Sequence, residues 1–511
     1  EITTYLEKSM ESELSANVID LCPVGALTSR PYAFEARPWE LKNTETIDVM
    51  DAVGSNIRVD TYGWEVKRVL PRLNESINEE WISDKTRFSC DGLLKQRIDV
   101  PYIRQNGRLK KSSWHEAQKI LIEKIKTFSP NEIAGCVGGL VDMEALYCFK
   151  KFFKNVIGSS NIECREKKTY LNPKHKRDYI FNTSIQNIDK SDFILLIGSN
   201  PRHEATIVNL RIRKAVIKNN AQAYSIGNPG DLSYPVKLFE GSTSVIKSIY
   251  EGNHEIYEKL KNAKKPVVIL GESALKGISG RYVFEAIKEV LFKLNHMNKN
   301  WNAFNVLTQS ASRIGAIDLG IYSIKEKDNY SFFNLLDSGK FKFLYLLGSD
   351  EIKINKKNEF VVYQGSHGDR GAEIADIVLP GAAYTEKDGV FINLEGRVQK
   401  TSKASYPPGN SKEDWKILHE LSVKMKNPID IKDHDDLESK IIKEIKLFSD
   451  FDELPSEDLN FNKPTKLDFI NEDINIDQID YYYTNPISRA SKTMSECRNN
   501  KKKGANYNGV F

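Results

Sequence analysis

A cysteine followed by a proline near the start of the chain is the first residue pair that could do chemistry. Cys22 and Pro23 begin the stretch Cys-Pro-Val-Gly-Ala. A Cys-Pro step closes many iron–sulfur ligand sets, in which the thiolate binds iron and the proline turns the chain away. Because apolar Val18, Ile19 and Leu21 precede it, we expect the thiolate to lie in a dry wall. Taken alone, a Cys-Pro step is more typical of a buried structural cysteine before a turn.

The six cysteines show no paired spacing. They occur at positions 22, 90, 136, 148, 164 and 497. A disulfide framework is therefore not expected, and the chain fits a reducing compartment. The formal net charge of +4, with 28% charged residues, is too balanced to favour a nucleic-acid partner. We expect the run Lys501–Lys503 to be a solvated tail.

Length and hydropathy predict a water-soluble globular chain with more than one domain. The chain has 511 residues and a mean hydropathy of −0.47, enough for roughly two to four domains. No run approaches the roughly 18–20 apolar residues that span a bilayer. A role at a membrane would therefore depend on partners.

From about residue 98, short apolar strands alternate with helices. Helices are expected over Ser113–Lys126, Met143–Ile157 and His203–Lys218. Apolar strands that end at glycine predict parallel sheets with helices on both faces, which bind ligands at the carboxyl ends of the strands. None of these turns forms Gly-x-Gly-x-x-Gly or a P-loop, so no nucleotide is predicted. The expected strands are Ile133–Val137, Asp192–Ile197, Ala221–Ile226, Pro266–Leu270, Phe341–Leu347 and Phe360–Gln364.

The segments outside this alternation have simpler patterns. Asn56–Asp60 and Glu65–Leu70 predict a β hairpin around Thr61–Gly63. Residues 421–470 predict helices joined by loops on the outside of the fold. Residues 471–511 predict a tail that extends over a partner or stays mobile, because they have little apolar content to bury.

Two charged groupings could be mistaken for catalytic sites. His367 lies beside Asp369, but no nucleophile or metal partner is near in sequence, so we expect a packed loop. The segment Glu386–Glu395 contains Gly389, and we expect it to be a solvated turn. No catalytic residue is assigned to the chain.

Several long motifs, in a fixed order along the chain, carry a family resemblance. They resemble the large iron–sulfur subunit of respiratory complex I, NADH:ubiquinone oxidoreductase. The resemblance covers most of the chain. The motifs are Glu7–Phe34, Ile197–Ala205, Tyr363–Asp369, Ala375–Lys387, Asn393–Gln399 and Asn485–Ser491.

The resemblance implies that Cys22 is the fourth ligand of a [4Fe–4S] cluster. In the family the other three ligands lie upstream, in a Cys-x-x-Cys-x-x-x-Cys run, whereas no cysteine precedes Cys22 in this sequence. Because one thiolate cannot hold such a cluster, either the chain is part of a longer product or a second polypeptide supplies three ligands. We favour a second, cysteine-rich polypeptide, as in a split-gene and mitochondrial form of this family.

The second unit of the chain resembles the small cluster-binding domain that opens molybdopterin oxidoreductases. Where that domain has four cysteines, this sequence has Asp48, Asp51, Ser55 and Ser83. Carboxylates and alcohols are hard oxygen ligands, whereas the iron of a cluster prefers soft thiolate. We therefore expect this unit to have lost its cluster.

The resemblance implies an α/β fold of the molybdopterin-oxidoreductase type, with parallel sheets, helices on both faces and a small β-rich domain before them. We expect the end of the [4Fe–4S]-binding region over residues 1–37 and the cluster-less small β domain over residues 38–97. The α/β domain without cofactor is expected over residues 98–420. A helical and loop extension is expected over residues 421–511.

The resemblance also implies a core subunit of the peripheral arm of complex I. This subunit would complete a shared [4Fe–4S] cluster on the electron path from NADH and FMN to ubiquinone and would scaffold the arm. No molybdenum, no nucleotide and no complete active site are expected on this chain. The expected partners are a cysteine-rich iron–sulfur chain, the flavin-binding subunit and other peripheral-arm subunits, with no nucleic acid and with membrane contact only through partners. The expected location is the matrix side of the mitochondrial inner membrane or the cytoplasmic face of a bacterial plasma membrane.

Two alternatives stay open at this point. An active molybdopterin oxidoreductase would need four cluster cysteines and a metal-ligating cysteine, selenocysteine or serine. The sequence has oxygen side chains at the cluster positions and no cysteine between residues 164 and 497. A cofactor-free structural subunit would instead leave Cys22 without iron.

Overall fold

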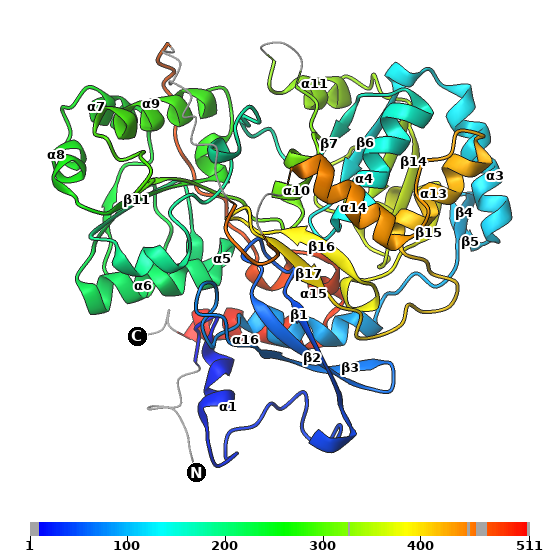
Figure 1. Cartoon of the computed structure of the whole chain (residues 1–511), viewed down its shortest axis with the longest axis horizontal. Helices are drawn as coiled ribbons and strands as arrows, with labels where there is room; N and C mark the ends of the chain where they lie inside the picture. Colours follow the sequence, from blue (N-terminus) through cyan, green and yellow to red (C-terminus); the bar gives the residue numbers. More distant parts are fainter. Residues whose placement is uncertain (1–9, 325–327, 447–449, 456–467, 508–511) are drawn as a thin grey trace.

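The computed structural model describes residues 10–324, 328–446, 450–455 and 468–507. Two α/β units lie side by side, and a small antiparallel sheet lies below the junction between them (Figure 1). The expected fold class is confirmed, since two largely parallel sheets follow a small β-rich unit. No described helix combines the length and the apolar composition needed to cross a bilayer.

The small sheet contains β1 (Lys42–Ile47), β2 (Asn56–Tyr62) and β3 (Glu65–Pro71), paired antiparallel in that order. The predicted hairpin is confirmed, and Gly63 reverses the chain with a φ of +61°. Strand β1 was not predicted from the sequence, because only its last two residues are buried. A short helix, α2 (Asp84–Phe88), follows the sheet.

The first α/β unit is built on a five-stranded parallel sheet. Its elements are β8 (Phe193–Ile197), α5 (Pro201–Glu204), α6 (Thr206–Asn219), β9 (Gln222–Ile226), β10 (Lys237–Phe239), α7 (Thr243–Tyr250), α8 (Glu255–Asn262), β11 (Pro266–Gly271), α9 (Gly280–Lys293) and β12 (Phe304–Leu307). The strand order is β10-β9-β8-β11-β12. Helix α6 packs on one face and helices α7, α8 and α9 on the other, so β8 and β11 are fully buried. The predicted helix His203–Lys218 is interrupted at Ala205, which separates α5 from α6.

The second α/β unit is built on a seven-stranded sheet. Its strands are β4 (Tyr102–Gln105), β5 (Arg108–Lys111), β6 (Ile133–Val137), β7 (Ile162–Glu163), β13 (Phe343–Leu347), β14 (Phe360–Gly365) and β15 (Ile377–Pro380). Their order is β5-β4-β15-β14-β13-β6-β7, and only β4 and β5 run antiparallel to their neighbours. The predicted strands at β6, β13 and β14 are confirmed. Their apolar side chains lie in the cores on both sides of the sheet.

The helices of the second unit cover both faces of its sheet. They are α3 (Trp114–Thr127), α4 (Met143–Lys151), α10 (Arg313–Asp318), α11 (Ser331–Asp337), α12 (Arg370–Ile374), α13 (Asp414–Lys424) and α14 (His434–Ile445). Helix α3 begins at Ser113, whose hydroxyl accepts a hydrogen bond from the Glu116 amide at 3.2 Å, as the predicted N-cap requires. Helix α4 continues as a π-helix (Phe152–Ile157), which completes the predicted helical span.

A buried hairpin replaces the solvated turn that we expected over Glu386–Glu395. Strands β16 (Gly389–Ile392) and β17 (Val398–Thr401) pair antiparallel. The Glu386 carboxylate is buried and pairs with the guanidinium of Arg97, with an Nη2–Oε2 distance of 2.7 Å. The expectation was wrong because a cation that is distant in sequence compensates this carboxylate, which sequence spacing alone does not reveal.

The C-terminal tail also differs from its prediction. Residues 468–494, here called the strap, pack on their own chain across both α/β units and the small sheet unit. Tyr481 of the strap is buried, and its hydroxyl accepts a hydrogen bond from the Lys85 amide at 3.1 Å. Arg489 donates to the Asp369 carboxylate at 2.7 Å. The strap contains helix α15 (Pro486–Ala490) and leads into α16 (Lys492–Tyr507).

The lysine run after the strap is not wholly solvated. The Lys501 ammonium lies 2.8 Å from the buried carboxylate of Glu13. Glu13 also accepts hydrogen bonds from Arg202. Hydrogen bonds from His203, Lys501 and Arg202 outweigh the cost of burial and lower the pKa of Glu13 to about 2. The start and the end of the described chain are therefore held together by charge.

Candidate metal centre at Cys22

Cys22 lies on an arm, residues 18–40, that leaves the small sheet unit and returns to it (Figure 1). Helix α1 (Val18–Leu21) leads directly into Cys22. On the return path, the Arg68 guanidinium lies 4.5 Å from the centre of the Tyr32 ring, a cation–π contact with strand β3. The arm is therefore attached at both ends, with Cys22 between them.

The root of the arm is fixed by hydrogen bonds to the segment that leads into helix α2. The Asn17 side chain donates to the Ile82 carbonyl at 2.8 Å and accepts from the Ile82 amide at 3.2 Å. The Ala16 amide donates to the buried Asp84 carboxylate at 3.0 Å. Because these bonds are buried and mutually satisfied, they hold the start of α1 in one position relative to the small sheet.

The Cys22 thiol is half-buried and is surrounded by backbone amide groups. Hydrogen bonds from the amides of Leu27, then Ala26, Val24 and Gly25, lower the pKa of Cys22, and slight desolvation opposes them. Gly25 closes the turn: its amide donates to the Cys22 carbonyl at 3.3 Å, and its φ is +64°. Amide groups that point at a sulfur stabilise the thiolate, and such bonds tune metal-bound thiolates. The geometry fits a thiolate that binds a metal.

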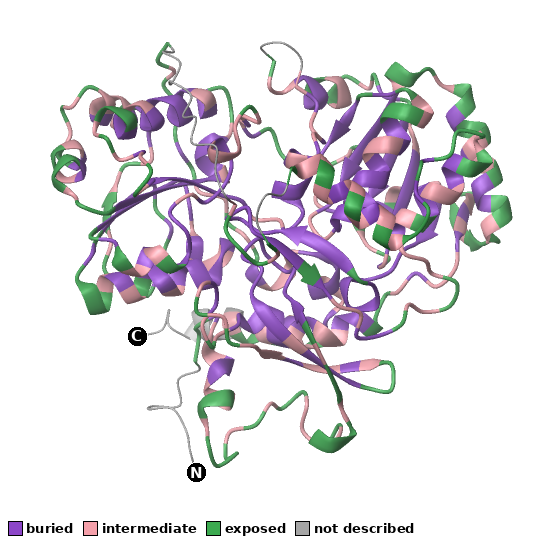
Figure 2. Ribbon diagram, viewed as in Figure 1, coloured by how far each residue is buried: buried purple, intermediate pink, exposed green. Residues whose placement is uncertain are grey.

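The surroundings of Cys22 are apolar but exposed, so the expected dry wall is wrong for this chain. Leu21 is 57% exposed, Val24 81% and Trp39 80%. Phe34, further along the arm, is fully exposed. Figure 2 shows the arm largely in the colour of exposed residues. The apolar residues near Cys22 do not cover one another; they form a surface that another polypeptide could cover.

The positions that match a second cluster are buried and bonded to one another. Thr86 donates to the Asp48 carboxylate at 2.7 Å, and its hydroxyl lies 2.7 Å from the hydroxyl of Ser83. The Asp48 amide donates to the Ser55 carbonyl at 2.8 Å. Burial, followed by the charge of Asp51, raises the pKa of Asp48 to about 7. The four positions therefore come together as expected, but as an oxygen-rich network that does not fit an iron–sulfur cluster.

Lys85 is a member of this network that the sequence analysis missed. Its side chain is buried beside the two aspartates, and burial lowers the pKa of Lys85 while the charges of Asp51 and Asp48 oppose that shift. The ammonium lies 5.3 Å from the centre of the Tyr481 ring. A lysine between apolar and acidic residues is typical of an exposed position, so the only available signal was its place two residues after Ser83.

Metal-ligand geometry is sparse across the described ranges. Among the described residues, no group of three or more His, Cys, Asp or Glu side chains is placed to hold a metal ion. The described part of the chain therefore offers Cys22 as one ligand and does not offer a complete set. All six cysteines are free thiols, as the lack of paired spacing predicted.

His367 and Asp369 are separate members of a packed loop, as predicted. The His367 ring is buried, with Nδ1 2.8 Å from the Ser366 hydroxyl and Nε2 3.0 Å from the Gly92 carbonyl. Burial, with the nearby charge of Arg97, lowers the pKa of His367 to about 3. Asp369 is engaged by the strap instead. The pair has no free group with which to act as acid or base.

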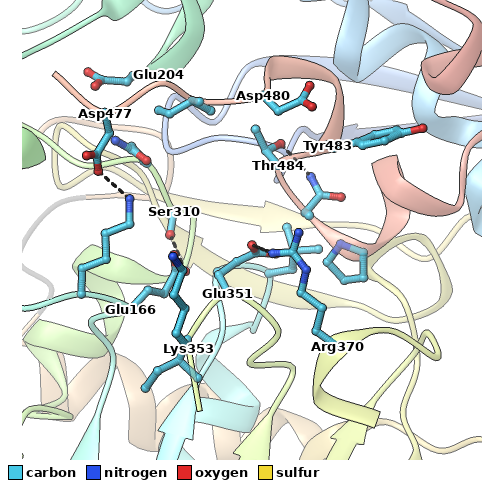
Figure 3. A pocket seen from close by; sticks show the side chains of 18 of the residues that line it. Glu166, Glu204, Ser310, Glu351, Lys353, Arg370, Asp477, Asp480, Tyr483 and Thr484 are labelled. Carbon is cyan, nitrogen blue, oxygen red and sulfur yellow. Dashed lines mark hydrogen bonds and ion pairs between the residues drawn. The ribbon is translucent and has the colours of Figure 1, made fainter. Parts of the chain in front are cut away.

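A cavity of about 780 Å³ lies where the carboxyl ends of both sheets meet the strap (Figure 3). Gly139 and Gly348 follow strands β6 and β13, and Glu204 follows β8. Open α/β sheets bind ligands at this place. Burial raises the pKa of Glu166 and of Glu204 to about 7. The sequence predicted this edge correctly but gave no sign that the strap covers it.

Comparison with protein families matches four models along the chain. The molybdopterin oxidoreductase model matches residues 97–424, and the NADH-quinone oxidoreductase subunit 3 ferredoxin-like domain matches residues 1–28. The NADH-ubiquinone oxidoreductase NDSU1/NuoG-like 4Fe-4S domain matches residues 41–91. The model for the C-terminal part of the same NADH-ubiquinone oxidoreductase component matches residues 464–497, which include most of the strap.

Curated relatives match over nearly the whole chain. The NADH-ubiquinone oxidoreductase 75 kDa subunit of Reclinomonas americana is 42% identical over 97% of this chain and 74% of the relative. The mitochondrial 78 kDa subunit of Candida albicans is 42% identical over 97% of this chain and 69% of the relative. The corresponding NADH-quinone oxidoreductase component of Rickettsia felis is 41% identical over 98% and 73%. With its arm, its small sheet unit, its two α/β sheets and its strap, the chain belongs to the NuoG (75 kDa subunit) family of NADH-ubiquinone and NADH-quinone oxidoreductases.

Proposed function

We propose that Cys22 supplies one thiolate ligand to a [4Fe–4S] cluster on the electron path from NADH and FMN to ubiquinone. The observation that carries this proposal is the half-exposed thiol with backbone amides directed at its sulfur. A bound cluster accepts and releases single electrons, and this chain's amide groups stabilise the charge on the ligating sulfur. The exposed apolar residues on the arm support a second surface that closes over the cluster.

The remaining three ligands come from a cysteine-rich iron–sulfur region that docks on the Cys22 arm. We assign this region to a partner chain. Cross-linking from the arm, followed by mass spectrometry of the joined peptides, tests the assignment. A cross-linked cysteine-rich peptide from a second polypeptide supports it. A peptide from a preceding segment of the same polypeptide would contradict the partner chain but would leave the role of Cys22 intact.

The experiment that tests the ligand role is Cys22→Ser in the assembled complex. We expect the loss of one [4Fe–4S] signal from the electron paramagnetic resonance spectrum and the loss of electron transfer from NADH to ubiquinone. Cys90→Ser is the matched control, because Cys90 is half-buried and burial raises its pKa to about 12. An unchanged set of cluster signals in Cys22→Ser would overturn the proposal in favour of a cofactor-free structural subunit.

The two α/β units serve as a scaffold without molybdenum and without a nucleotide. The oxygen network at Asp48, Asp51 and Ser83 supports this proposal, because an active molybdopterin oxidoreductase of this type would need thiolates there. Metal analysis of the purified complex tests it. Stoichiometric molybdenum or tungsten would favour the oxidoreductase alternative.

We place the chain in the peripheral arm, beside the flavin-binding subunit and other peripheral-arm subunits, with membrane contact only through them. The names of the relatives support the matrix side of the mitochondrial inner membrane or the cytoplasmic face of a bacterial plasma membrane. Alkaline carbonate treatment of membranes should release the chain from the membrane fraction. Retention after this treatment would contradict a purely peripheral position.

A further inference from the structure

The cavity between the two sheets has properties that the proposed electron-transfer role does not use. Its volume of about 780 Å³ falls within the roughly 300–1,000 Å³ of small-molecule sites. Its walls come from the strand ends of both sheets, and its roof comes from the strap, including Asp477, Tyr483 and Asn485. A cavity of this size at this place in an α/β fold is a candidate binding site.

Lys85 contributes a cation without a hydrogen-bond acceptor to the wall of this cavity. The residue is 2% exposed and lines the cavity. Within the described ranges, no side chain or carbonyl accepts a hydrogen bond from its ammonium, whose contact with the Tyr481 ring is a cation–π contact. A buried ammonium has three donors, and leaving them without acceptors is costly. Acceptors for Lys85 must therefore come from the contents of the cavity.

A second group of cations faces the strap from the opposite wall. Figure 3 shows Lys353 and Arg370 across the cavity from Asp477 and Asp480. Lys353 forms no ion pair within the part of the chain that the structure describes. Arg370 is 59% exposed and contacts Glu351 at 3.2 Å. The cavity therefore opens to solvent on the side where these cations lie.

The wall already binds one anionic group, which belongs to the strap. The Asp477 carboxylate accepts from the Lys167 ammonium at 2.7 Å and pairs with Lys276 as well. Two ammonium groups thus converge on one carboxylate. This contact shows that the cavity wall can hold an anionic oxygen group, and that one positive charge there remains in excess.

The remaining charges adjust to the occupant. Six cationic side chains and six carboxylates line the cavity. Two of the carboxylates, Glu166 and Glu204, have a pKa raised to about 7 by burial. Each of them is therefore close to neutral when an anion enters, because an added negative charge favours their protonated forms.

We infer that this cavity binds a small molecule that carries two or more phosphate or carboxylate groups, with Lys85 and Lys353 as its anchors. Lys85 supplies the buried end of the site and Lys353 the solvent side. The ligand class follows from donors that are unpaired on both walls. This site is separate from the Cys22 arm and does not depend on the cluster.

Isothermal titration calorimetry of the full chain with pyrophosphate and, separately, with citrate tests this inference. We expect one site per chain for at least one of the two probes, and the comparison tells phosphate from carboxylate ligands. Lys353→Met and Lys85→Met should each weaken binding by about tenfold. Lys261→Met is the matched control, because Lys261 is exposed and far from the cavity lining; its affinity should equal that of the wild type.

A third variant gives the opposite sign. Asp477→Asn removes the internal carboxylate that competes for Lys167 and Lys276, so the probe should bind more tightly. If Lys85→Met does not fold, as judged by circular dichroism, Lys353→Met and Asp477→Asn still decide the question. No binding of either probe, equal weakening in Lys261→Met, or weaker binding in Asp477→Asn would overturn the inference.

Discussion

Cys22 and Asp48 occupy positions where ligand spacing places an iron–sulfur cluster, yet their surroundings are opposite. Cys22 lies half-buried on an arm, with amides directed at its sulfur and exposed apolar residues around it. Asp48 lies buried among its own partners, including Thr86 and the nearby charge of Lys85. The first site is incomplete within the described chain, whereas the second is filled by the chain itself.

This difference shows two outcomes for a cofactor site. Where thiolates are absent, buried oxygen groups must bond one another and a cation must compensate their charge, because isolated buried charges are costly. Where the thiolate is retained, its surroundings remain open for another ligand set. The same structural unit holds both sites, since the root of the arm is bonded to Asp84, next to Ser83.

The largest expected contrast is chemical reactivity. In the isolated chain, Cys22 should react with iodoacetamide at least about 100-fold faster than buried Cys136. The amides lower the pKa of Cys22, whereas burial raises the pKa of Cys136. Mass spectrometry of peptides from a timed reaction at pH 7.5 measures both rates. Equal rates would show that the arm does not present its thiol as the structure indicates.

A pair of glycine substitutions compares the two regions in stability. A Cβ at Gly92 would lie 2.1 Å from the Ile487 carbonyl oxygen of the strap, so Gly92→Ala should cost about 3 kcal/mol of unfolding free energy. Gly25, in the Cys22 turn, has a positive φ and open space around it. Gly25→Ala should cost only about 1 kcal/mol. Urea unfolding measures both, and a smaller loss for Gly92→Ala than for Gly25→Ala would contradict the close packing of the strap.

The filled site should give the protein a pH dependence that the arm does not. The folded chain holds the proton of Asp48 up to a pH of about 7, whereas an unfolded aspartate releases it near pH 4, so stability falls as the pH rises between these values. Asp48→Asn should therefore reduce the loss of stability between pH 5 and pH 8 by about 1–3 kcal/mol.

The control for this measurement is Asp337→Asn, because Asp337 is 66% exposed. Its stability should change with pH as that of the wild type does. Urea unfolding at several pH values provides the curves. A wild-type slope in Asp48→Asn would mean that Asp48 is ionised in the folded chain.

The smallest expected effect on stability is at the exposed apolar surface of the arm. Trp39→Ser should change the unfolding free energy by less than about 0.5 kcal/mol, because Trp39 is 80% exposed. The same variant should reduce incorporation into the complex, measured by native electrophoresis, because the surface lacks its cover. A large loss of stability without an assembly defect would mean that Trp39 packs on its own chain.

The fold was predictable where the signal is local. Strands β6 and β8 are short apolar runs that end at glycine, and covering on both faces makes every position apolar. The strap was missed because its buried residues, such as Tyr481 and Ile487, are single positions in polar sequence with no period. Long-range packing, rather than local preference, decides their burial.

The candidate site was predictable in identity but not in environment. The Cys-Pro step and the motifs around it singled out Cys22, and ligand spacing singled out Asp48 and Ser83. Lys85 was missed because a buried lysine depends on charges that are brought together only by the fold. The dry wall was wrong because Leu21 and its apolar neighbours face outward in this chain.

The most direct test of this account is to locate iron in the assembled complex, by anomalous diffraction at the iron edge. We expect iron at bonding distance from the Cys22 sulfur and no iron among residues 48–83. Iron bound to Asp48, Asp51 or Ser83, or only packed side chains around the Cys22 sulfur, would contradict it.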